Sequence, residues 1–305
     1  MIDILKNPRA HKSGVKMVDD ASGQKKKTSR RFTQYIRKHP EFAIGLLIIG
    51  VNIFLMVFAP LIVPYPPEEA NFFEVRLPPS RTHLFGTDQS GMDIFSRVIY
   101  APRIDVTIAL AGTFLSLIVG VVVGIIVGYW KNWLTEGIQR VADLFQAFPV
   151  FVLAMALVAV TGQKMTNVIL VIAFLNVPIY MRLMRSNVLS TVNQTYVEAA
   201  VSVGNSDMRI LFRHILPNTI GNAITQASVN IGWAILLTSG LSFIGAGVPV
   251  PTPEWGAMIA VGAPTIITGE WWSSVFPGLA IALTALGFSL VGDGFKDFLD
   301  PTRRN

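Results

Sequence analysis

The chain has 305 residues, of which 51% are hydrophobic and only 14% are charged, whereas soluble domains carry about 25% charged residues. Because the charge deficit is concentrated in long uncharged blocks, the composition indicates a membrane protein and not a soluble domain with a large core. The chain has no cysteine, which excludes disulfides, thiol catalysis and cysteine metal sites. The net charge of +6 comes mostly from basic residues before and between the apolar blocks, so we attribute it to membrane topology and not to nucleic-acid binding.

Residues 1–41 are polar and basic, and we interpret them as a cytoplasmic tail, since polybasic segments beside a span set topology and contact anionic lipid. Residues 42–63 are uncharged and, at ~1.5 Å per residue, can cross the ~30 Å hydrocarbon layer. This segment is too long for a cleavable signal, and no small-residue cleavage site follows it, so we predict a retained first transmembrane helix. Residues 64–104 are turn-rich and predict an extracytoplasmic loop.

Further uncharged stretches lie at residues 106–130, 144–163, 165–181, 220–244 and 271–292, so we predict about six transmembrane helices. The stretch at 165–181 is short but can be extended by one turn toward Arg185. Residues 255–269 are uncharged but too few for a span and contain Pro264, so we predict an interfacial or re-entrant helix there. We assign residues 105–295 to a transmembrane core and 296–305 to a cytoplasmic tail.

Within the second predicted span, glycines recur every four residues at Gly120, Gly124 and Gly128. This spacing places small residues on one helix face, where another helix can approach closely. We expect the neighbouring helix to belong to this same chain.

The distribution of basic residues predicts the orientation of the chain. With both termini inside and six spans, 20 of the 25 lysine and arginine residues lie in inside segments and 5 in outside segments. This agrees with the rule that cytoplasmic segments carry the excess of positive charge. Counting residues 255–269 as a seventh span would move the C-terminal basic residues outside, so we reject it.

The interval between the fourth and fifth spans is the most informative part of the sequence. Residues 196–203 are good helix formers with Glu198 in the first turn, and Gly204 is placed to end the helix. Ser206 or Asp207 can cap a second helix that reaches residue 212, and Pro217 is expected to separate this unit from the fifth span. From physics alone, the unit is either a projecting docking element or an amphipathic connector lying on the membrane.

This pattern resembles the Glu-Ala-Ala signature of membrane subunits of binding-protein-dependent ABC importers. The matching residues are Glu198, Ala199, Ala200, Gly204, Leu216 and Pro217. The isoleucine of the signature falls one place late, at Ile215, with His214 in its position. The resemblance implies that this element is a coupling helix, which couples the chain to separate ATPase subunits that bind ATP and Mg.

Other stretches resemble the peptide/nickel subfamily, most closely the second permease of dipeptide and oligopeptide importers. They are residues 83–88 and 91–93, 241–247 leading into 251–258, and 276–280 running to 292–294 and 299–301. The resemblance implies an all-α fold like that of type I ABC importers, in the bacterial inner membrane. It also implies a homologous permease partner, two ATPase subunits and an extracytoplasmic binding protein. Met92 and Ala101-Pro102 depart from the subfamily pattern.

The implied cargo is a peptide or a similar small solute, with nickel, opines or oligosaccharides as alternatives. The loops around Asp88, Asp93, Glu254 and Trp255 are expected to face the binding protein. Turn capping is the better account of Asp88 and Asp93 themselves. The four histidines are scattered, so we expect no metal site.

This sequence contains no recognisable ATP-binding motif of its own. No Gly-x-x-x-x-Gly-Lys-Ser/Thr loop occurs, so energy must come from another chain or from an ion gradient. No ionisable residue falls in the middle of a predicted span, which disfavours an ion-driven carrier, and no nucleophile or metal pair suggests an enzyme. Asn176, Gln226 and Asn230 are polar residues at depth and are expected to form interhelical hydrogen bonds or, alternatively, to line the substrate pathway.

Overall fold

The computed structural model describes residues 36–299 of the chain. Most of the predicted N-terminal tail, residues 1–35, and the last six residues of the predicted C-terminal tail, 300–305, lie outside this range, whereas residues 296–299 belong to the last helix. Within the described range the chain is all-helical, apart from one isolated bridge between Thr87 and Asp93. The predicted all-α fold is confirmed.

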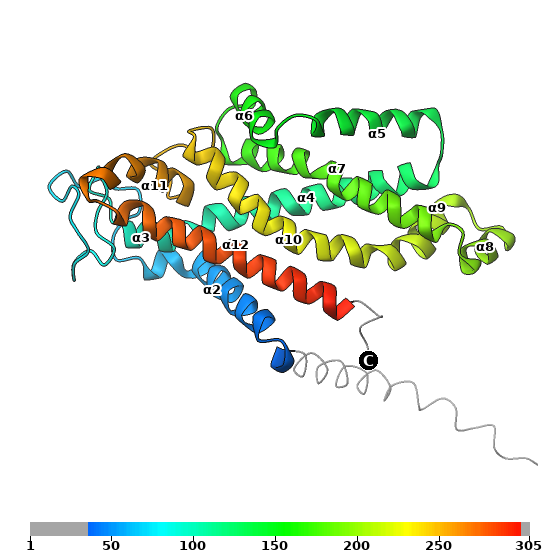
Figure 1. Ribbon diagram of the computed structural model, residues 1–305, viewed down its shortest axis with the longest axis horizontal. Helices are drawn as coiled ribbons and strands as arrows, with labels where there is room; N and C mark the ends of the chain where they lie inside the picture. Colours follow the sequence, from blue (N-terminus) through cyan, green and yellow to red (C-terminus); the bar gives the residue numbers. More distant parts are fainter. Residues whose placement is uncertain (1–35, 300–305) are drawn as a thin grey trace, which may run out of the picture.

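The helices form an elongated bundle (Figure 1). In chain order they are α2 (Pro40–Ile62), α3 (Ile94–Tyr100), α4 (Pro102–Tyr129), α5 (Trp133–Gln146), α6 (Val150–Thr161), α7 (Met165–Thr191), α8 (Thr195–Ser202), α9 (Asp207–Arg209), the π-helix η1 (Ile210–Ile215), α10 (Leu216–Phe243), α11 (Trp255–Gly262), the 3₁₀-helix η2 (Ala263–Thr268) and α12 (Trp272–Leu299). Residues 63–93, α3 and α11 lie at one end, which we call the loop end, and α8 and α9 lie at the opposite end, which we call the α8 end.

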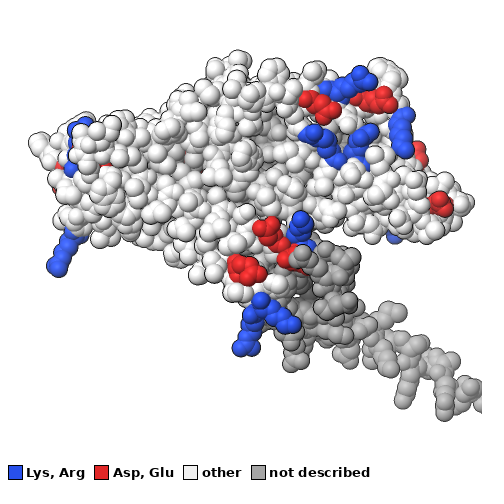
Figure 2. Space-filling view, viewed as in Figure 1, with Lys and Arg blue, Asp and Glu red and all other residues white. Residues whose placement is uncertain are grey.

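Four helices are long and apolar enough to cross a membrane: α2, α3–α4 taken together, α7 and α12. The bent pair α5–α6 makes a fifth if it is counted as one span. In the face shown in Figure 2, charged side chains gather at the left-hand end and over the middle and right-hand part, and an uncharged band lies between these two groups. α10 has 28 residues and is long enough to cross a membrane, but it carries the polar residues Asn222, Gln226 and Asn230 and is not among the apolar spans of the described chain. The count of six spans therefore stays a prediction.

The third predicted span, at residues 144–163, is wrong as a single straight helix. The chain instead forms α5 and α6, whose axes differ by 97°. Pro149 stands in front of α6 with extended backbone torsions (φ −55°, ψ 125°). Proline disfavours helical torsions in the residue before it, here Phe148, so the helix breaks at this point.

The glycines of α4 lie at a close contact with another helix, as the sequence predicts. A Cβ atom on Gly124 would lie 2.6 Å from the backbone oxygen of Met181, and one on Gly120 would lie 2.5 Å from the Tyr180 Cβ. Gly128 meets Val188 and Arg185 in the same way. The expectation that the neighbouring helix, α7, belongs to the same chain is confirmed.

Two boundaries differ from the prediction because the helices continue through polar residues. The fourth span extends past 181 to Thr191 and includes Arg182 and Arg185. Pro217 does not separate the docking unit from the next span, because α9, η1 and α10 follow one another without a break. Pro217 occupies the first turn of α10, where a missing N–H is tolerated. The apolar segment at 255–269 is short, as predicted, and forms α11 and η2.

Candidate functional site

The Glu-Ala-Ala segment folds as a short helix, α8, at the end of the bundle farthest from the loop end (Figure 1). Gln194 precedes it with extended torsions, and Glu198 lies in its first turn, where a negative charge is favourable. The predicted helix at 196–203 therefore forms within one residue of its expected bounds.

Gly204 ends α8 in a left-handed conformation, with φ at +82°. The N–H of Gly204 donates to the oxygen of Val201 at 2.8 Å, and the N–H of Asn205 donates to the oxygen of Ala200 at 3.2 Å. These two bonds are the Schellman pattern, which satisfies the last carbonyl groups of a helix. Apart from its two chain neighbours, no described residue has an atom within 4 Å of a Cβ built on Gly204, so the requirement for glycine comes from its torsion angle and not from crowding.

One face of α8 anchors the helix to the bundle. Val197 and Ala200 are buried against Ile210, Leu211 and Ile215 of η1, in a core that also includes residues of α4 and α7. At the start of α9, the Tyr129 hydroxyl donates to Asp207 Oδ1 at 2.8 Å, which joins the end of α4 to the same unit. α8 therefore packs on η1, and η1 leads directly into α10.

The opposite face of α8 is exposed. It presents Glu198, Ala199 and Val201, and Val203 is 83% exposed at the end of the helix. Leu216 is half-buried and Pro217 is exposed, both in the first turn of α10. The six residues of the signature thus divide into an anchor (Ala200), a turn (Gly204), an exposed pair (Glu198 and Ala199) and the start of the next long helix.

Asn176 lies on α7 and borders a cavity of about 300 Å³ at the bend between α5 and α6. Its Nδ2 donates to the oxygen of Ile172 at 2.9 Å. The rest of the lining is mostly apolar and includes Phe145, Phe174 and Trp233. Asn176 and Gln146 therefore contribute the polar groups of an otherwise apolar cavity lining.

Gln226 and Asn230 lie one turn apart on α10, and Gln226 Nε2 donates to Asn230 Oδ1 at 2.9 Å. Asn230 is buried, and it lies beside the Tyr180 hydroxyl of α7, which also neighbours Ser116 of α4. No hydrogen bond between described residues joins Asn176 to either of them. The position of Asn230 between three helices favours the packing role over the pathway role.

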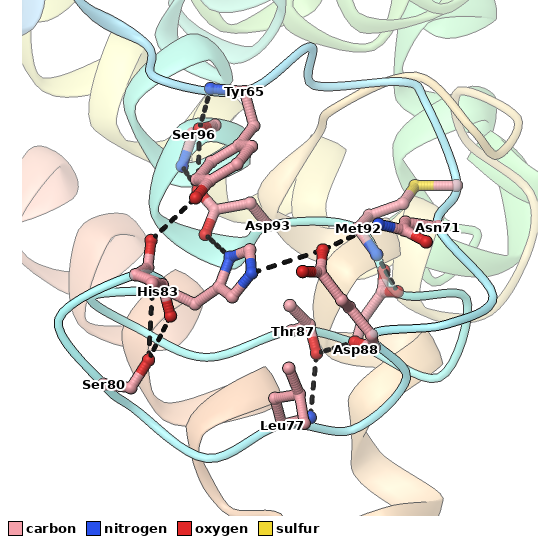
Figure 3. Close-up of polar contacts among 12 residues, drawn as sticks. Tyr65, Asn71, Leu77, Ser80, His83, Thr87, Asp88, Met92, Asp93 and Ser96 are labelled. Atoms are coloured by element: carbon pink, nitrogen blue, oxygen red, sulfur yellow. Dashed lines mark hydrogen bonds and ion pairs between the residues drawn. The ribbon is translucent and has the colours of Figure 1, made fainter.

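Asp88 and Asp93 act as caps in the 63–93 segment (Figure 3). Asp88 Oδ1 accepts from the N–H groups of Ser90 and Met92, at 2.8 and 3.0 Å. Asp93 Oδ2 accepts from the Ser96 N–H at 2.7 Å and caps α3, while its Oδ1 lies 2.9 Å from His83 Nδ1. Both capping roles agree with the account drawn from turn chemistry.

The side chains of Asp88, Asp93, Glu254 and Trp255 are all buried. That their loops face a binding protein stays a prediction, and the four side chains themselves do not lie on the surface. Other residues form the exposed surface of the loop end, among them Phe73, which is 99% exposed. These four side chains can be buried because each has a hydrogen-bond partner within the protein. Three of the four residues cap helices or turns, and Trp255 Nε1 donates to the oxygen of Val98 at 3.2 Å.

Sequence reasoning missed two buried residues of the loop end, Arg97 and Asp105. Arg97 was counted only as an outside charge, but its Nη1 donates to the backbone oxygens of Pro67 and Pro251 and to the sulfur of Met92. Asp105 stands in the first turn of α4, and its partner lies in α11. No local pattern marks either residue, because their partners are distant in the sequence. Among the described residues no cluster of histidine and acidic side chains could hold a metal.

Comparison with known proteins identifies the family. Residues 120–305 match the family described as "Binding-protein-dependent transport system inner membrane component". The chain belongs to this family. Residues 28–79 match a second family, the N-terminal TM domain of oligopeptide transport permease C. The chain is thus a permease of the multi-pass inner-membrane type, a transport component that acts with a substrate-binding protein and an ATPase.

Individual relatives agree with this assignment over almost the whole permease. The dipeptide transport system permease protein DppC of Alkalihalophilus pseudofirmus is 38% identical over 90% of this chain and 90% of its own length. The glutathione transport system permease protein GsiD of Pectobacterium atrosepticum is 37% identical over 88% and 89%. GsiD of Escherichia coli is 40% identical over 89% and 88%. The resemblance to the second permease of peptide importers is confirmed.

Proposed function

We propose that this permease forms, together with a second homologous permease, the translocation pathway of an ATP-driven importer for peptides. In this proposal two ATPase subunits bind ATP and Mg and hydrolyse the nucleotide, and α8 is the element on which one of them acts. An extracytoplasmic binding protein delivers the cargo at the loop end. The chain itself contributes the pathway and the coupling, and no catalysis.

The observation that carries the proposal is the construction of α8. Its inner face packs on η1 while Glu198 and Ala199 point outward, and Gly204 ends it with a fixed turn. A helix held in this way can be moved as a rigid body by a partner seated on its outer face. The loop end and the α8 end lie at opposite ends of the bundle (Figure 1), as delivery at one end and driving at the other require.

A peptide cargo is supported by relatives whose names specify dipeptides and glutathione. Nickel, opine and oligosaccharide cargoes stay as alternatives. A panel of labelled solutes, offered with the binding protein to the reconstituted complex, separates them. We expect uptake of peptides that requires ATP. Uptake by this chain alone, driven by an ion gradient, would instead identify a secondary carrier.

Coupling through α8 is tested at Gly204. In the complex reconstituted into nanodiscs with its ATPase and binding protein, Gly204→Val should lower binding-protein-stimulated ATP hydrolysis by about tenfold, since a non-glycine residue in the left-handed region costs roughly 1–2 kcal/mol. Gly204→Asn is the matched control, because asparagine tolerates this torsion, and it should keep most of the stimulation. Both variants should insert into the membrane at the level of the parent chain. Full stimulation in Gly204→Val would contradict the coupling role of α8.

We further propose that both termini are cytoplasmic and that α10 and the α5–α6 pair complete six spans. Support comes from the excess of basic residues in the inside segments. Because the chain has no cysteine, single substitutions at Phe73 and Val203 provide clean labelling sites. A membrane-impermeant maleimide added to intact spheroplasts should label Phe73→Cys at once and Val203→Cys only after permeabilisation. The reverse pattern would overturn the orientation without affecting the family assignment.

A further inference from the structure

Asp105 is a fully buried carboxyl group at the loop end, with 0% of its surface exposed. It stands in the first turn of α4, and its Oδ2 accepts a hydrogen bond from the backbone N–H of Trp255 at 3.2 Å. Trp255 is the first residue of α11, so this bond joins two helices that are far apart in the sequence.

Glu254, the residue before Trp255, is also 0% exposed. Its side chain caps α11, since Oε2 accepts from the backbone N–H of Ala257 at 2.6 Å. The Gly256 N–H and the Ser242 hydroxyl also lie within reach of the carboxyl group. Gly256 packs so closely on the backbone of Ser239 in α10 that a side chain there would not fit, which fixes the position of the capping residue.

The two carboxyl groups face each other closely enough to form a hydrogen bond. One oxygen of each, Asp105 Oδ1 and Glu254 Oε1, has no donor among the described residues. Two adjacent buried carboxylates repel each other and lack solvation, so such a pair is not expected to ionise completely. A proton shared by the two carboxyl groups supplies a hydrogen bond to the two oxygens that have no donor.

Between residues 36 and 299, no basic side chain forms an ion pair with either carboxyl group. The groups that act on Asp105 are Glu254 and the Trp255 N–H, and those that act on Glu254 are Asp105, the Ser242 hydroxyl and the N–H groups of α11. The guanidinium of Arg97 lies in the same end of the bundle, but it faces Asp88 and Glu68. Burial raises the pKa of the Glu254 carboxyl above its ordinary value.

We propose that Asp105 and Glu254 form a proton-binding site that holds one shared proton, and that this proton fastens the first turn of α11 to the first turn of α4. When the proton is lost, two negative charges face each other and α11 loosens from α4. How stably α11 packs on α4 then depends on the pH at the loop end. This inference does not depend on the cargo or on coupling through α8.

The number of protons is tested by infrared spectroscopy of the full-length chain in nanodiscs at pH 7, where exposed carboxyl groups are ionised. We expect the parent chain to show one protonated-carboxyl band per molecule that is absent from the double variant Asp105→Asn/Glu254→Gln. Asp143→Asn, which removes a half-exposed carboxyl from α5, is the control and should leave the band unchanged. If the double variant kept the whole band, or lost the intensity of two carboxyl groups, the proposal of one shared proton would be wrong.

The mechanical consequence is tested by hydrogen–deuterium exchange, which does not require the double variant to fold. In the parent chain, the protection of amides in α11 should fall as pH rises, after correction for the faster chemical exchange at high pH. In Asp105→Asn, whose amide can donate to Glu254 at every pH, protection should stay constant, and in Asp143→Asn it should follow the parent. Protection in the parent chain that does not change with pH would refute the proposal.

Discussion

Arg97 Nη1 lies 3.0 Å from the backbone oxygen of Pro251, which is 154 positions away in the chain. The same nitrogen donates to the oxygen of Pro67 at 2.6 Å and to the sulfur of Met92 at 2.8 Å. One buried cation thereby joins the segment after α2, the helix α3 and the segment before α11. Met92, which departs from the subfamily pattern, is part of this contact.

Replacing Arg97 should weaken the loop end. Arg97→Met removes charged hydrogen bonds from a buried guanidinium to two backbone oxygens, so we expect the free energy of unfolding to fall by about 2–4 kcal/mol. The measurement is thermal unfolding of the purified chain in detergent. Arg81→Met, at an exposed position, should change the midpoint little. Equal midpoints for the two variants would show that the Arg97 contacts do not stabilise this end.

The contact between α4 and α7 should tolerate no side chain at Gly124. In Gly124→Val the new Cβ would lie 2.6 Å from the Met181 oxygen, so the helices must separate, at a cost of about 1–3 kcal/mol. Gly50→Val in α2 is the matched control, because no atom of another described helix lies within 4 Å of a Cβ there. Thermal midpoints of both variants in the same detergent decide the matter. A Gly50 variant as unstable as the Gly124 variant would point to helix propensity and not to packing.

Asp93 has two tasks, the capping of α3 and the contact with His83, and two substitutions separate them. Asp93→Ala should lower stability by about 1–2 kcal/mol, since the Ser96 N–H loses its acceptor. Asp93→Asn keeps a capping oxygen and should recover most of that loss. The measurement is the denaturation midpoint, together with proteolysis of the 63–93 segment. If asparagine were as harmful as alanine, the charge facing His83 would be the more important feature.

The raised pKa of Glu254 predicts how stability depends on pH. The folded chain holds a proton that the unfolded chain releases near the ordinary value of 4.5, so this contribution is complete below that pH and is lost as pH rises through the folded-state pKa. We expect the difference in unfolding free energy between the parent and Glu254→Gln to shift steadily in favour of the variant over this interval. Unfolding midpoints measured across the pH range provide the test. A difference that does not vary with pH would contradict the raised pKa.

Several elements were predictable because their signals are local. The uncharged run at 42–63 became α2, the glycine spacing in α4 became a close helix contact, and Gly204 became the left-handed end of α8. Each depends on residues within one or two turns of one another. The family resemblance rested on the same local motifs.

Other features depended on contacts that no local pattern contains. The bend between α5 and α6 interrupts an uncharged run that hydropathy alone joins, because hydropathy does not register the backbone restriction at Pro149. Pro217 was expected to end a unit, but the preceding π-turn leads directly into α10 and places the proline where it is tolerated. Asn230 was a candidate for the pathway until its burial between three helices favoured packing.

The sequence by itself determined that this chain is a helical permease with a Glu-Ala-Ala helix, since composition, hydropathy and short motifs are properties of neighbouring residues. Only the tertiary structure decided which charged side chains are buried and with whom. Asp105 and Trp255 are 150 positions apart, and Arg97 and Pro251 are 154 apart. Such pairs meet because helix packing at the loop end removes them from solvent, and burial then requires each polar group to find a partner.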